Sequence, residues 1–267
     1  MTAMSLPAIG KSKISFRGGA IFPITDGPRI SVVVPAMNEA KNLPLVLPHI
    51  PAWVDEIILV DGNSTDDTIE TAKRLVPDII IVQQEGRGKG AALRCGFAAA
   101  RGDIIITLDA DGSADPAEMP AYVGALLAGA DFVKGSRFLQ GGNTSDMEWY
   151  RMLGNWGLVK LVRLTFGGRF TDLCYGYNAF WRDILPHMNL EDVDGFEIET
   201  AMNIQALRAR LKVAEVASKE FRRVHGVSNL RTIPDGWRVL STIVKLGFSR
   251  PAPVEIPQGT RTEWLGS

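Results

Sequence analysis

Asp109 and Asp111 are separated by a single residue and directly follow the apolar run Ile104–Leu108. Two anions this close repel each other unless a cation lies between them. Carboxylate oxygens are hard ligands that suit Mg²⁺ or Mn²⁺, and such an ion neutralises the charge on a departing diphosphate. The pair therefore predicts a divalent-metal site, with capping of a turn or helix as the alternative for so short a pattern.

A glycine-rich segment, Gly86–Gly90, carries the cations Arg87 and Lys89 and precedes a helical pattern over residues 91–100. Backbone N–H groups and cations at a helix N-terminus suit a phosphate group. Ala91 stands where the phosphate loop of kinases and ATPases has serine or threonine, so that class of enzyme is disfavoured. An ordinary glycine-rich loop is the alternative.

Short β-branched runs that alternate with helical stretches must position these side chains. The runs that we predict to be strands are Ile30–Val34, Glu56–Val60, Asp78–Val82, Asp103–Leu108 and Asp131–Lys134. Such alternation is typical of a parallel sheet with helices on both faces, and ligands of these sheets bind beyond the carboxyl ends of the strands.

Three further polar residues follow the first two predicted strands. Asn38 and Glu39 come after the first strand, where they either contact a nucleobase or cap the next helix. Asp61 comes after the second, where it either binds a ribose hydroxyl or closes a turn. We therefore expect the polar strand ends to meet at one edge of the sheet.

Composition excludes several classes of protein. The 267 residues include 29 Lys+Arg and 30 Asp+Glu, so bulk charge does not predict binding to nucleic acid. The two cysteines, Cys95 and Cys174, form neither a zinc motif nor a disulfide framework. No apolar run approaches the ~20 residues of a membrane-spanning helix, and no secretory signal is visible. We expect a cytoplasmic protein, with peripheral contact with the cytoplasmic face of a membrane as a further hypothesis.

Changes in composition predict the domain boundaries. We expect a flexible segment over residues 1–28, one catalytic domain over 29–250 and a flexible tail over 251–267. Within the domain, residues 29–140 form the metal half, and residues 141–250, where tryptophan, arginine and glycine become more frequent, form the acceptor half.

Four motifs, in this order, resemble those of the family 2 inverting glycosyltransferases: Val34–Glu39, Val60–Asp66, Gly88–Ala92 and Leu108–Asp111. The resemblance covers residues 29–230 and is closest to the dolichyl- and polyprenyl-phosphate mannosyl- and glucosyltransferase branch. It implies the GT-A fold, an α/β fold with a Rossmann-like, mostly parallel sheet flanked by helices and a C-terminal helical portion on the acceptor side. It also implies a nucleotide-diphosphate sugar donor and a divalent metal, Mg²⁺ or Mn²⁺.

The resemblance also implies a set of site residues. Its substrate-binding positions are Pro35, Ala36, Asn38, Glu39, Asp61, Lys89, Gly90, Asp109, Ala110, Asp172, Arg222, Arg223, His225 and Ser228. Its catalytic positions are Arg137, Asp111, Glu197 and Glu199, and the metal ligands are Asp109 and Asp111. This branch often has glutamine where the chain has Ser113, so no third metal ligand is assigned.

Whether the reaction needs a general base distinguishes the possible classes of acceptor. An alcohol needs a general base to attack the sugar, whereas a phosphate is already anionic near neutral pH. The Glu-Asp pair that many family 2 enzymes present is absent around Phe196–Thr200, which favours a polyprenyl phosphate. Glu197 or Glu199 as a base for a hydroxyl acceptor is the alternative, and a salt bridge from Glu199 to Arg208 or Arg222 is the structural interpretation of that residue.

Two stretches have the character of membrane-surface helices. Residues 237–248 combine cations on one helical stripe with apolar residues elsewhere, and residues 149–166 are apolar almost all round. A helix of either kind packs in a core or contacts lipid, and both interpretations stay open.

Other classes of protein fit less well. A nucleotidyltransferase or an NAD-dependent oxidoreductase would have a glycine-rich loop straight after the first strand, where this chain has Pro35–Glu39. A non-catalytic module that binds nucleotide sugars, and transfer to a soluble hydroxyl acceptor, remain alternatives. The sequence does not distinguish GDP-mannose from UDP-glucose as the donor.

Overall fold

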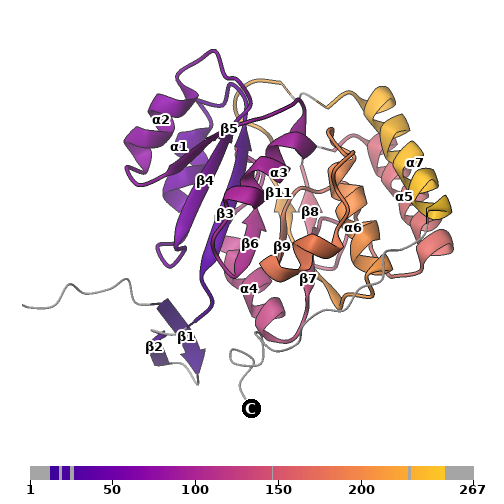
Figure 1. The fold of residues 1–267 in the computed structure, drawn as a ribbon, viewed down its shortest axis with the longest axis horizontal. Helices are drawn as coiled ribbons and strands as arrows, with labels where there is room; N and C mark the ends of the chain where they lie inside the picture. The colour runs from indigo at the N-terminus through magenta and orange to yellow at the C-terminus, as the bar shows by residue number, and fades with distance from the viewer. Residues whose placement is uncertain (1–12, 18–19, 25–26, 146, 228–229, 250–267) are drawn as a thin grey trace, which may run out of the picture.

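A seven-stranded sheet with the order β10-β7-β9-β6-β3-β4-β5 forms the centre of the protein (Figure 1). The structure is a computed structural model that describes residues 13–17, 20–24, 27–145, 147–227 and 230–249. The strands of this sheet are β3 (Ile30–Ala36), β4 (Glu56–Asp61), β5 (Ile80–Gln83), β6 (Ile104–Thr107), β7 (Phe132–Ser136), β9 (Asn178–Trp181) and β10 (Val213–Ala217). All neighbouring pairs are parallel except the two that β9 makes with β6 and β7.

The five predicted strands are confirmed as β3 to β7. The central strands β3 and β6 are rich in valine and isoleucine and are buried almost throughout, as expected of strands covered on both faces. The antiparallel strand β9 and the edge strand β10 were not predicted. Each is only four or five residues long, and β9 inserts between two strands that come earlier in the chain.

Helices flank the sheet, as predicted. They are α1 (Leu43–Val46), α2 (Thr68–Leu75), α3 (Lys89–Ala99), α4 (Met119–Leu127), α5 (Trp149–Phe166), α6 (Ile198–Arg208) and α7 (Thr232–Phe248), with 3₁₀ turns η1 (Leu47–His49), η2 (Pro116–Glu118) and η3 (Arg182–His187). Helix α3 packs on β3 and β4 at Gly96, where an added Cβ would lie 2.3 Å from Val33 Cγ1. This close approach fixes the N-terminus of α3 at the strand ends.

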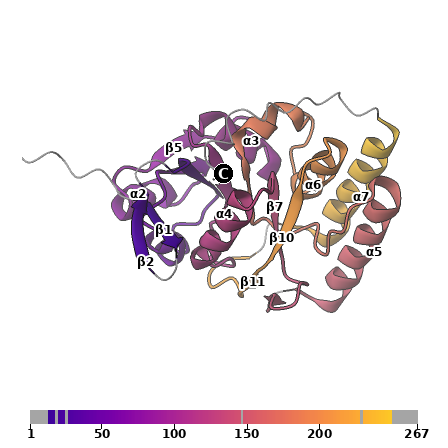
Figure 2. The ribbon, with the colours of Figure 1, turned by 90° about the horizontal axis from the view of Figure 1, so that it is seen from below.

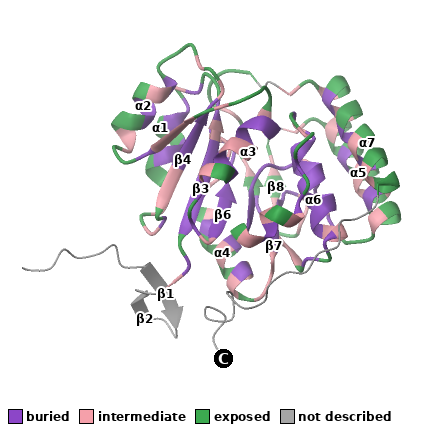
Figure 3. Cartoon of the chain, viewed as in Figure 1, coloured by how far each residue is buried: buried purple, intermediate pink, exposed green. Residues whose placement is uncertain are grey.

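The C-terminal part of the described chain includes a layer of three helices, in which α5 and α7 lie side by side at the far end of the molecule (Figures 1 and 2). A small separate core that includes Val162, Ile204 and Ile243 joins them to α6. Only Asn155 and Val162 of α5 are buried, and Figure 3 shows both outer helices largely exposed. Helix α5 therefore packs one face against this small core and leaves its other face exposed, so the core interpretation of residues 149–166 holds for one face only.

Two small sheets lie outside the main one. β1 (Lys13–Arg17) pairs with β2 (Ala20–Ile24) in an antiparallel hairpin, and β8 (Asn143–Thr144) pairs with β11 (Lys219–Glu220). This hairpin was not predicted, and flexibility over residues 1–28 stays a prediction. The expected tail over 251–267 lies outside the described residues. Among the residues that the structure describes, no helix has the length and apolar character needed to cross a bilayer.

Candidate active site

A cavity of about 850 Å³ opens at the carboxyl ends of β3 and β6 and continues to the gap between α5 and α7. Its lining near the strand ends includes Pro35, Glu39, Lys89, Asp109 and Asp111. Its lining in the helical half includes Tyr150, Arg151, Leu158, Thr232 and Val239. One continuous space thus joins the polar strand ends predicted from the sequence to a helical region with both polar and apolar side chains.

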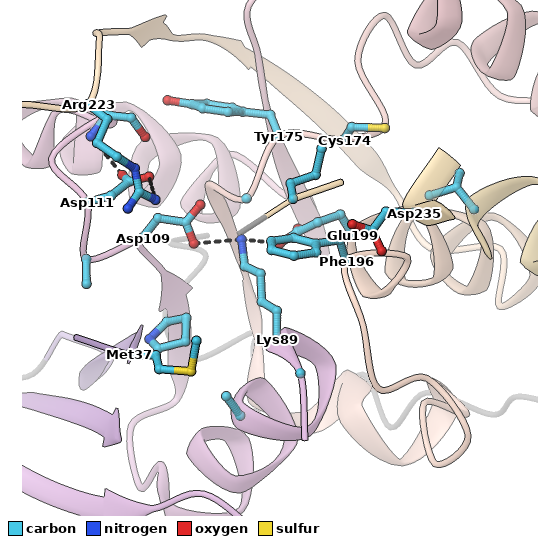
Figure 4. Close-up of a pocket in the computed structure, with 18 of the residues that line it drawn as sticks. Met37, Lys89, Asp109, Asp111, Cys174, Tyr175, Phe196, Glu199, Arg223 and Asp235 are labelled. Atoms are coloured by element: carbon cyan, nitrogen blue, oxygen red, sulfur yellow. Dashed lines mark hydrogen bonds and ion pairs between the residues drawn. The ribbon is translucent and has the colours of Figure 1, made fainter. Parts of the chain in front are cut away.

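The ammonium group of Lys89 lies between two carboxylates (Figure 4). Lys89 Nζ is 2.6 Å from Asp109 Oδ1 and 2.9 Å from Glu199 Oε1. Burial alone lowers the pKa of Lys89, but the two carboxylates outweigh burial and raise its pKa above the usual range. Burial raises the pKa of Asp109, with Asp111 and Glu199 adding to the rise and Lys89 opposing it. Glu199 thus forms its salt bridge with Lys89, and not with Arg208 or Arg222 as the structural interpretation of that residue had it.

Arg223 forms a second bridge across the cavity. Its guanidinium is 2.9 Å from Glu39 Oε1 and 2.8 Å from Asp111 Oδ2, and Asp111 Oδ1 accepts a hydrogen bond from the backbone N–H of Ser113. Burial raises the pKa of the Glu39 carboxyl, an effect that Asn42 and Arg223 oppose. Residues from the first strand end and from the loop after β11 therefore meet at the carboxylate predicted to hold the metal.

The charges at the strand ends suit a divalent cation. Four carboxylates, of Glu39, Asp109, Asp111 and Glu199, face the two cations Lys89 and Arg223, a formal excess of two negative charges. In the described part of the chain, no three acidic, histidine or cysteine residues cluster in a way that would enclose a metal ion. Mg²⁺ is usually bound through one or two carboxylates together with substrate phosphates and water. Asp109 and Asp111 fit that donor set.

Arg137 is buried, forms ion pairs with two carboxylates and also lines the cavity. It donates two hydrogen bonds to the carboxylate of Asp172, at 2.7 and 3.0 Å, and one to Glu220 at 2.9 Å. Burial alone raises the pKa of Asp172, but the adjacent guanidinium outweighs burial and holds its pKa below the usual range. The pair orients the segment that carries Tyr175, over whose ring the guanidinium stacks at 4.9 Å.

The structure brings most of the predicted site residues to one cavity. Those that line it are Pro35, Ala36, Glu39, Lys89, Asp109, Ala110, Asp111, Arg137, Glu199 and Arg223. Those that do not line it are Asn38, Asp61, Gly90, Asp172, Glu197, Arg222 and His225. Ser228 lies outside the described residues. The role assigned to each of these residues stays a prediction.

Several of the residues away from the cavity wall hold neighbouring segments in place. The side chain of Asn38, whose φ is +59°, accepts a hydrogen bond from Thr65 N–H. The carboxylate of Asp61 accepts from Ser64 N–H and from the side chain of Gln83. The bond from Ser64 N–H corresponds to the turn interpretation of Asp61. Asn38 does not cap the next helix, because the N-cap of α1 is Asn42.

Gly90 packs against the backbone of another segment, and this contact predicts a stability effect. A Cβ at Gly90 would lie 2.0 Å from the carbonyl oxygen of Val193, so Gly90→Ala forces the two segments apart. Overpacking of this kind costs about 1–3 kcal/mol. We expect a lower free energy of unfolding for Gly90→Ala in urea titrations. Gly124→Ala in α4 is the matched control, since a Cβ there meets nothing within 4 Å, and it should keep or slightly increase stability. Equal stabilities for both variants would contradict the contact.

Sequence reasoning missed Arg151 as a site residue. Five cationic side chains line the cavity: Arg87, Lys89, Arg137, Arg151 and Arg223. Three of them are in ion pairs, whereas within the described ranges no carboxylate pairs with Arg87 or Arg151. Arg151 is half-buried on α5 and donates a hydrogen bond to Thr232 Oγ1 of α7 at 3.3 Å. The available signal was a cation in the first turn of a mostly apolar helix, well before the other two cations of that helix, Lys160 and Arg163.

Asp235 was also missed. It is buried in the first turn of α7 and lines the helical part of the cavity (Figure 4). Its carboxylate accepts a hydrogen bond from the backbone N–H of Arg231 at 2.7 Å, so it stabilises the start of that helix. An acidic residue in the first turn is common in helices, so the sequence alone did not distinguish Asp235 from an ordinary helix-stabilising residue.

Known proteins resemble this chain in sequence and in fold. Residues 31–188 match the family described as glycosyl transferase family 2. A polyprenol monophosphomannose synthase of Mycolicibacterium smegmatis is 31% identical over 214 residues, which cover 76% of this chain and 81% of the relative. An undecaprenyl-phosphate mannosyltransferase of Micrococcus luteus is 29% identical over 213 residues, which cover 76% of this chain and 87% of the relative.

A solved structure has the same arrangement of strands and helices. It is the glucosyl-3-phosphoglycerate synthase of Mycobacterium tuberculosis, in complex with Mn²⁺, uridine diphosphate and phosphoglyceric acid. The TM-score is 0.68 at 27% sequence identity, and the match covers 85% of this chain and 80% of that one. The sequence relatives are thus named for lipid-phosphate acceptors, whereas the structural neighbour is named for a soluble one.

Proposed function

Because the chain belongs to glycosyl transferase family 2 and is a glycosyltransferase with the GT-A fold, we propose that it transfers a hexose to a polyprenyl phosphate. The donor is a nucleotide-diphosphate sugar of the GDP-mannose or UDP-glucose type, and the transfer inverts the anomeric carbon. The observation that carries this proposal is the single cavity that runs from Asp109 and Asp111 to the gap between α5 and α7, where Arg151 lines it together with apolar side chains.

The donor diphosphate would lie against the charged strand ends. A bound Mg²⁺ or Mn²⁺, held by Asp109 and Asp111, supplies positive charge to the leaving group. Lys89 and Arg223 are within reach of the same space and would bind the diphosphate oxygens. Complexes of the structural neighbour with Mn²⁺ and uridine diphosphate support a metal-dependent nucleotide site of this kind.

The acceptor phosphate would lie in the helical half of the cavity, at Arg151. This guanidinium has no acidic partner among the described residues, and the apolar side chains of Leu158 and Val239 line the space around it. An arginine without an acidic partner, in a wall that also contains apolar side chains, suits an anionic head on an apolar chain, because the planar guanidinium can donate two hydrogen bonds to one phosphate group.

A phosphate acceptor also removes the need for a base. In the proposed reaction a phosphate oxygen of the acceptor attacks the anomeric carbon, the bond from that carbon to the diphosphate breaks, and the nucleoside diphosphate departs. A phosphate monoester is largely ionised at neutral pH, so no proton has to be removed first. The carboxylates of Asp109, Asp111 and Glu199 are already in ion pairs, which leaves them poorly suited to take a proton from a hydroxyl.

A donor screen followed by product analysis tests this function. Thermal unfolding is measured with GDP-mannose and UDP-glucose, each with and without Mn²⁺, and one of them should raise the melting temperature only with the metal. Incubation of that donor with polyprenyl phosphate should then yield a hexosyl polyprenyl phosphate. Transfer only to phosphoglyceric acid or a simple alcohol would establish a soluble acceptor instead, and donor binding without any transfer would establish a binding module.

Exposed apolar stripes on α5 and α7 support contact with a membrane. Trp149, Leu153 and Trp156 lie on the outside of α5, and Trp237 and Phe248 on the outside of α7. The basic side chains of these helices are exposed or half-buried, whereas their single acidic residue is buried, so the layer is suited to an anionic surface. We propose a cytoplasmic enzyme that binds peripherally to the cytoplasmic membrane face.

Substitution of the outer tryptophans is expected to weaken that binding. Trp149 is 75% exposed and Trp237 is 69% exposed, so replacing both with glutamate removes apolar contact area without opening the core. Loss of one large buried side chain costs about 1.5–3 kcal/mol, and we expect at least a ten-fold weaker partition to anionic liposomes in co-sedimentation. Leu45→Glu on α1, which is 41% exposed and distant in sequence, is the control. Equal retention of all three proteins would contradict this orientation.

A further inference from the structure

The position of Glu199 makes it unsuited to contact an acceptor. Its side chain is 3% exposed, against 30% for Asp109, and one carboxylate oxygen lies 2.9 Å from the ammonium of Lys89. The other oxygen accepts a hydrogen bond from the side-chain amide of Asn178 at 3.0 Å. A general base must reach the proton that it removes, and both oxygens of Glu199 are directed at protein groups instead.

The Glu199 carboxylate is in turn held in place by a residue of the central sheet, Asn178. Asn178 lies on β9, and its amide group also reaches Thr107 Oγ1 on β6 and the carbonyl oxygen of Gly176. Glu199 itself lies in the first turn of α6, where buried side chains surround it. The carboxylate therefore has a fixed place relative to the end of β6, from which Asp109 projects.

The space around the ammonium is equally restricted. A Cβ at Gly176 would lie 2.5 Å from Lys89 Nζ and 2.6 Å from Asp109 Oδ2, so the backbone here lies directly against the ion pair. A lysine side chain otherwise has a flexible four-carbon stem and considerable rotamer freedom. The site thus closes around Lys89 from three sides: Asp109, Glu199 and Gly176.

We infer that Glu199 is a positioning residue: it holds the Lys89 ammonium next to the Asp109 carboxylate. The ammonium is then already in place to bind the donor diphosphate. This inference rests on the proposed function and specifies how the diphosphate is recognised. Because the Lys89 ammonium is paired with Glu199 as well as with Asp109, it neutralises Asp109 only in part. The Asp109 carboxylate therefore retains negative charge with which to bind the metal. Preorganised charges of this kind cost little reorganisation when the leaving group departs.

A double-mutant cycle on nucleotide binding tests the inference. The dissociation constants of UDP and GDP are measured by calorimetry with Mn²⁺ for the wild type, Glu199→Gln, Lys89→Met and the double variant. We expect about a ten-fold weaker binding for Glu199→Gln, and a double variant no weaker than Lys89→Met alone, because Glu199 acts through Lys89. Glu70→Gln is the matched control and should bind as the wild type does, because Glu70 is exposed in the first turn of α2 and does not line the cavity.

The pH dependence of turnover gives a second readout that does not require the lysine variant to fold. A positioning role leaves the shape of the kcat profile of Glu199→Gln unchanged, whereas loss of a general base removes its acidic limb. Full nucleotide affinity in Glu199→Gln, additive losses in the double variant, or loss of that acidic limb would overturn the inference. A wild type that binds neither UDP nor GDP with Mn²⁺ would overturn the proposed function as well.

Discussion

Asp111→Asn is expected to lower the kcat/KM of sugar transfer by roughly 1,000-fold, because a metal ligand contributes several kcal/mol of charge stabilisation to the transition state. The asparagine side chain has the same shape and can still accept the hydrogen bond that Ser113 N–H donates to Asp111. The loss is therefore expected in chemistry and metal affinity rather than in folding. Initial rates at saturating and at limiting Mn²⁺, together with the melting temperature, measure both.

Asp67→Asn is the matched control for that substitution. Asp67 is exposed at the start of α2, its side chain makes no capping hydrogen bond, and it does not line the cavity. Asp67→Asn removes the same single negative charge as Asp111→Asn. Comparison of the two variants therefore separates a local effect at the site from the effect of a changed net charge. A rate for Asp111→Asn within a few-fold of the rate for Asp67→Asn would remove Asp111 from the metal site.

Arg151→Gln is expected to weaken use of a polyprenyl phosphate by roughly 30- to 150-fold in kcat/KM. Hydrogen bonds to a charged group contribute about 2–3 kcal/mol, and Arg151 has no acidic partner that the substitution would leave unpaired. Donor binding and slow hydrolysis of the donor by water should remain near wild-type levels, because the donor side of the cavity is unchanged. Steady-state kinetics with varied acceptor, and donor affinity by calorimetry, measure the two effects separately.

Arg163→Gln on the same helix controls for the lost positive charge. Arg163 is exposed and does not line the cavity, so it shares any attraction to an anionic membrane but not the acceptor contact. A similar loss in both variants would assign the effect to membrane attraction. Loss of donor binding in Arg151→Gln would move this arginine to the donor side and contradict the proposed place of the acceptor phosphate.

The donor half was predictable because its signals are local. Runs such as Ile30–Val34 and Ile104–Leu108 are rich in β-branched residues, and this composition predicts buried strands directly. The polar motifs with the candidate site residues follow each run within a few positions. Since parallel strands end at one edge of a sheet, the meeting of Glu39, Lys89 and Asp109 in one cavity followed from strand order.

The acceptor half was less predictable because its strands are short and its contacts join distant segments. β9 has four residues and no alternating pattern, yet it lies between β6 and β7, where Asn178 reaches Glu199. Whether α5 packs in a core or faces outward depends on which neighbours cover it, and an apolar sequence is compatible with either.

By itself, the sequence determined the family, the positions of the strands β3 to β7 along the chain, and the pair of acidic residues at the end of β6, since each depends on residues close together in the chain. The tertiary structure decided which charges meet. It paired Lys89 with Glu199 and Arg223 with Asp111, across 110 and 112 residues respectively. Ion pairs of this kind form only when packing of the two halves brings their segments together, and spacing along the chain carries no trace of that packing.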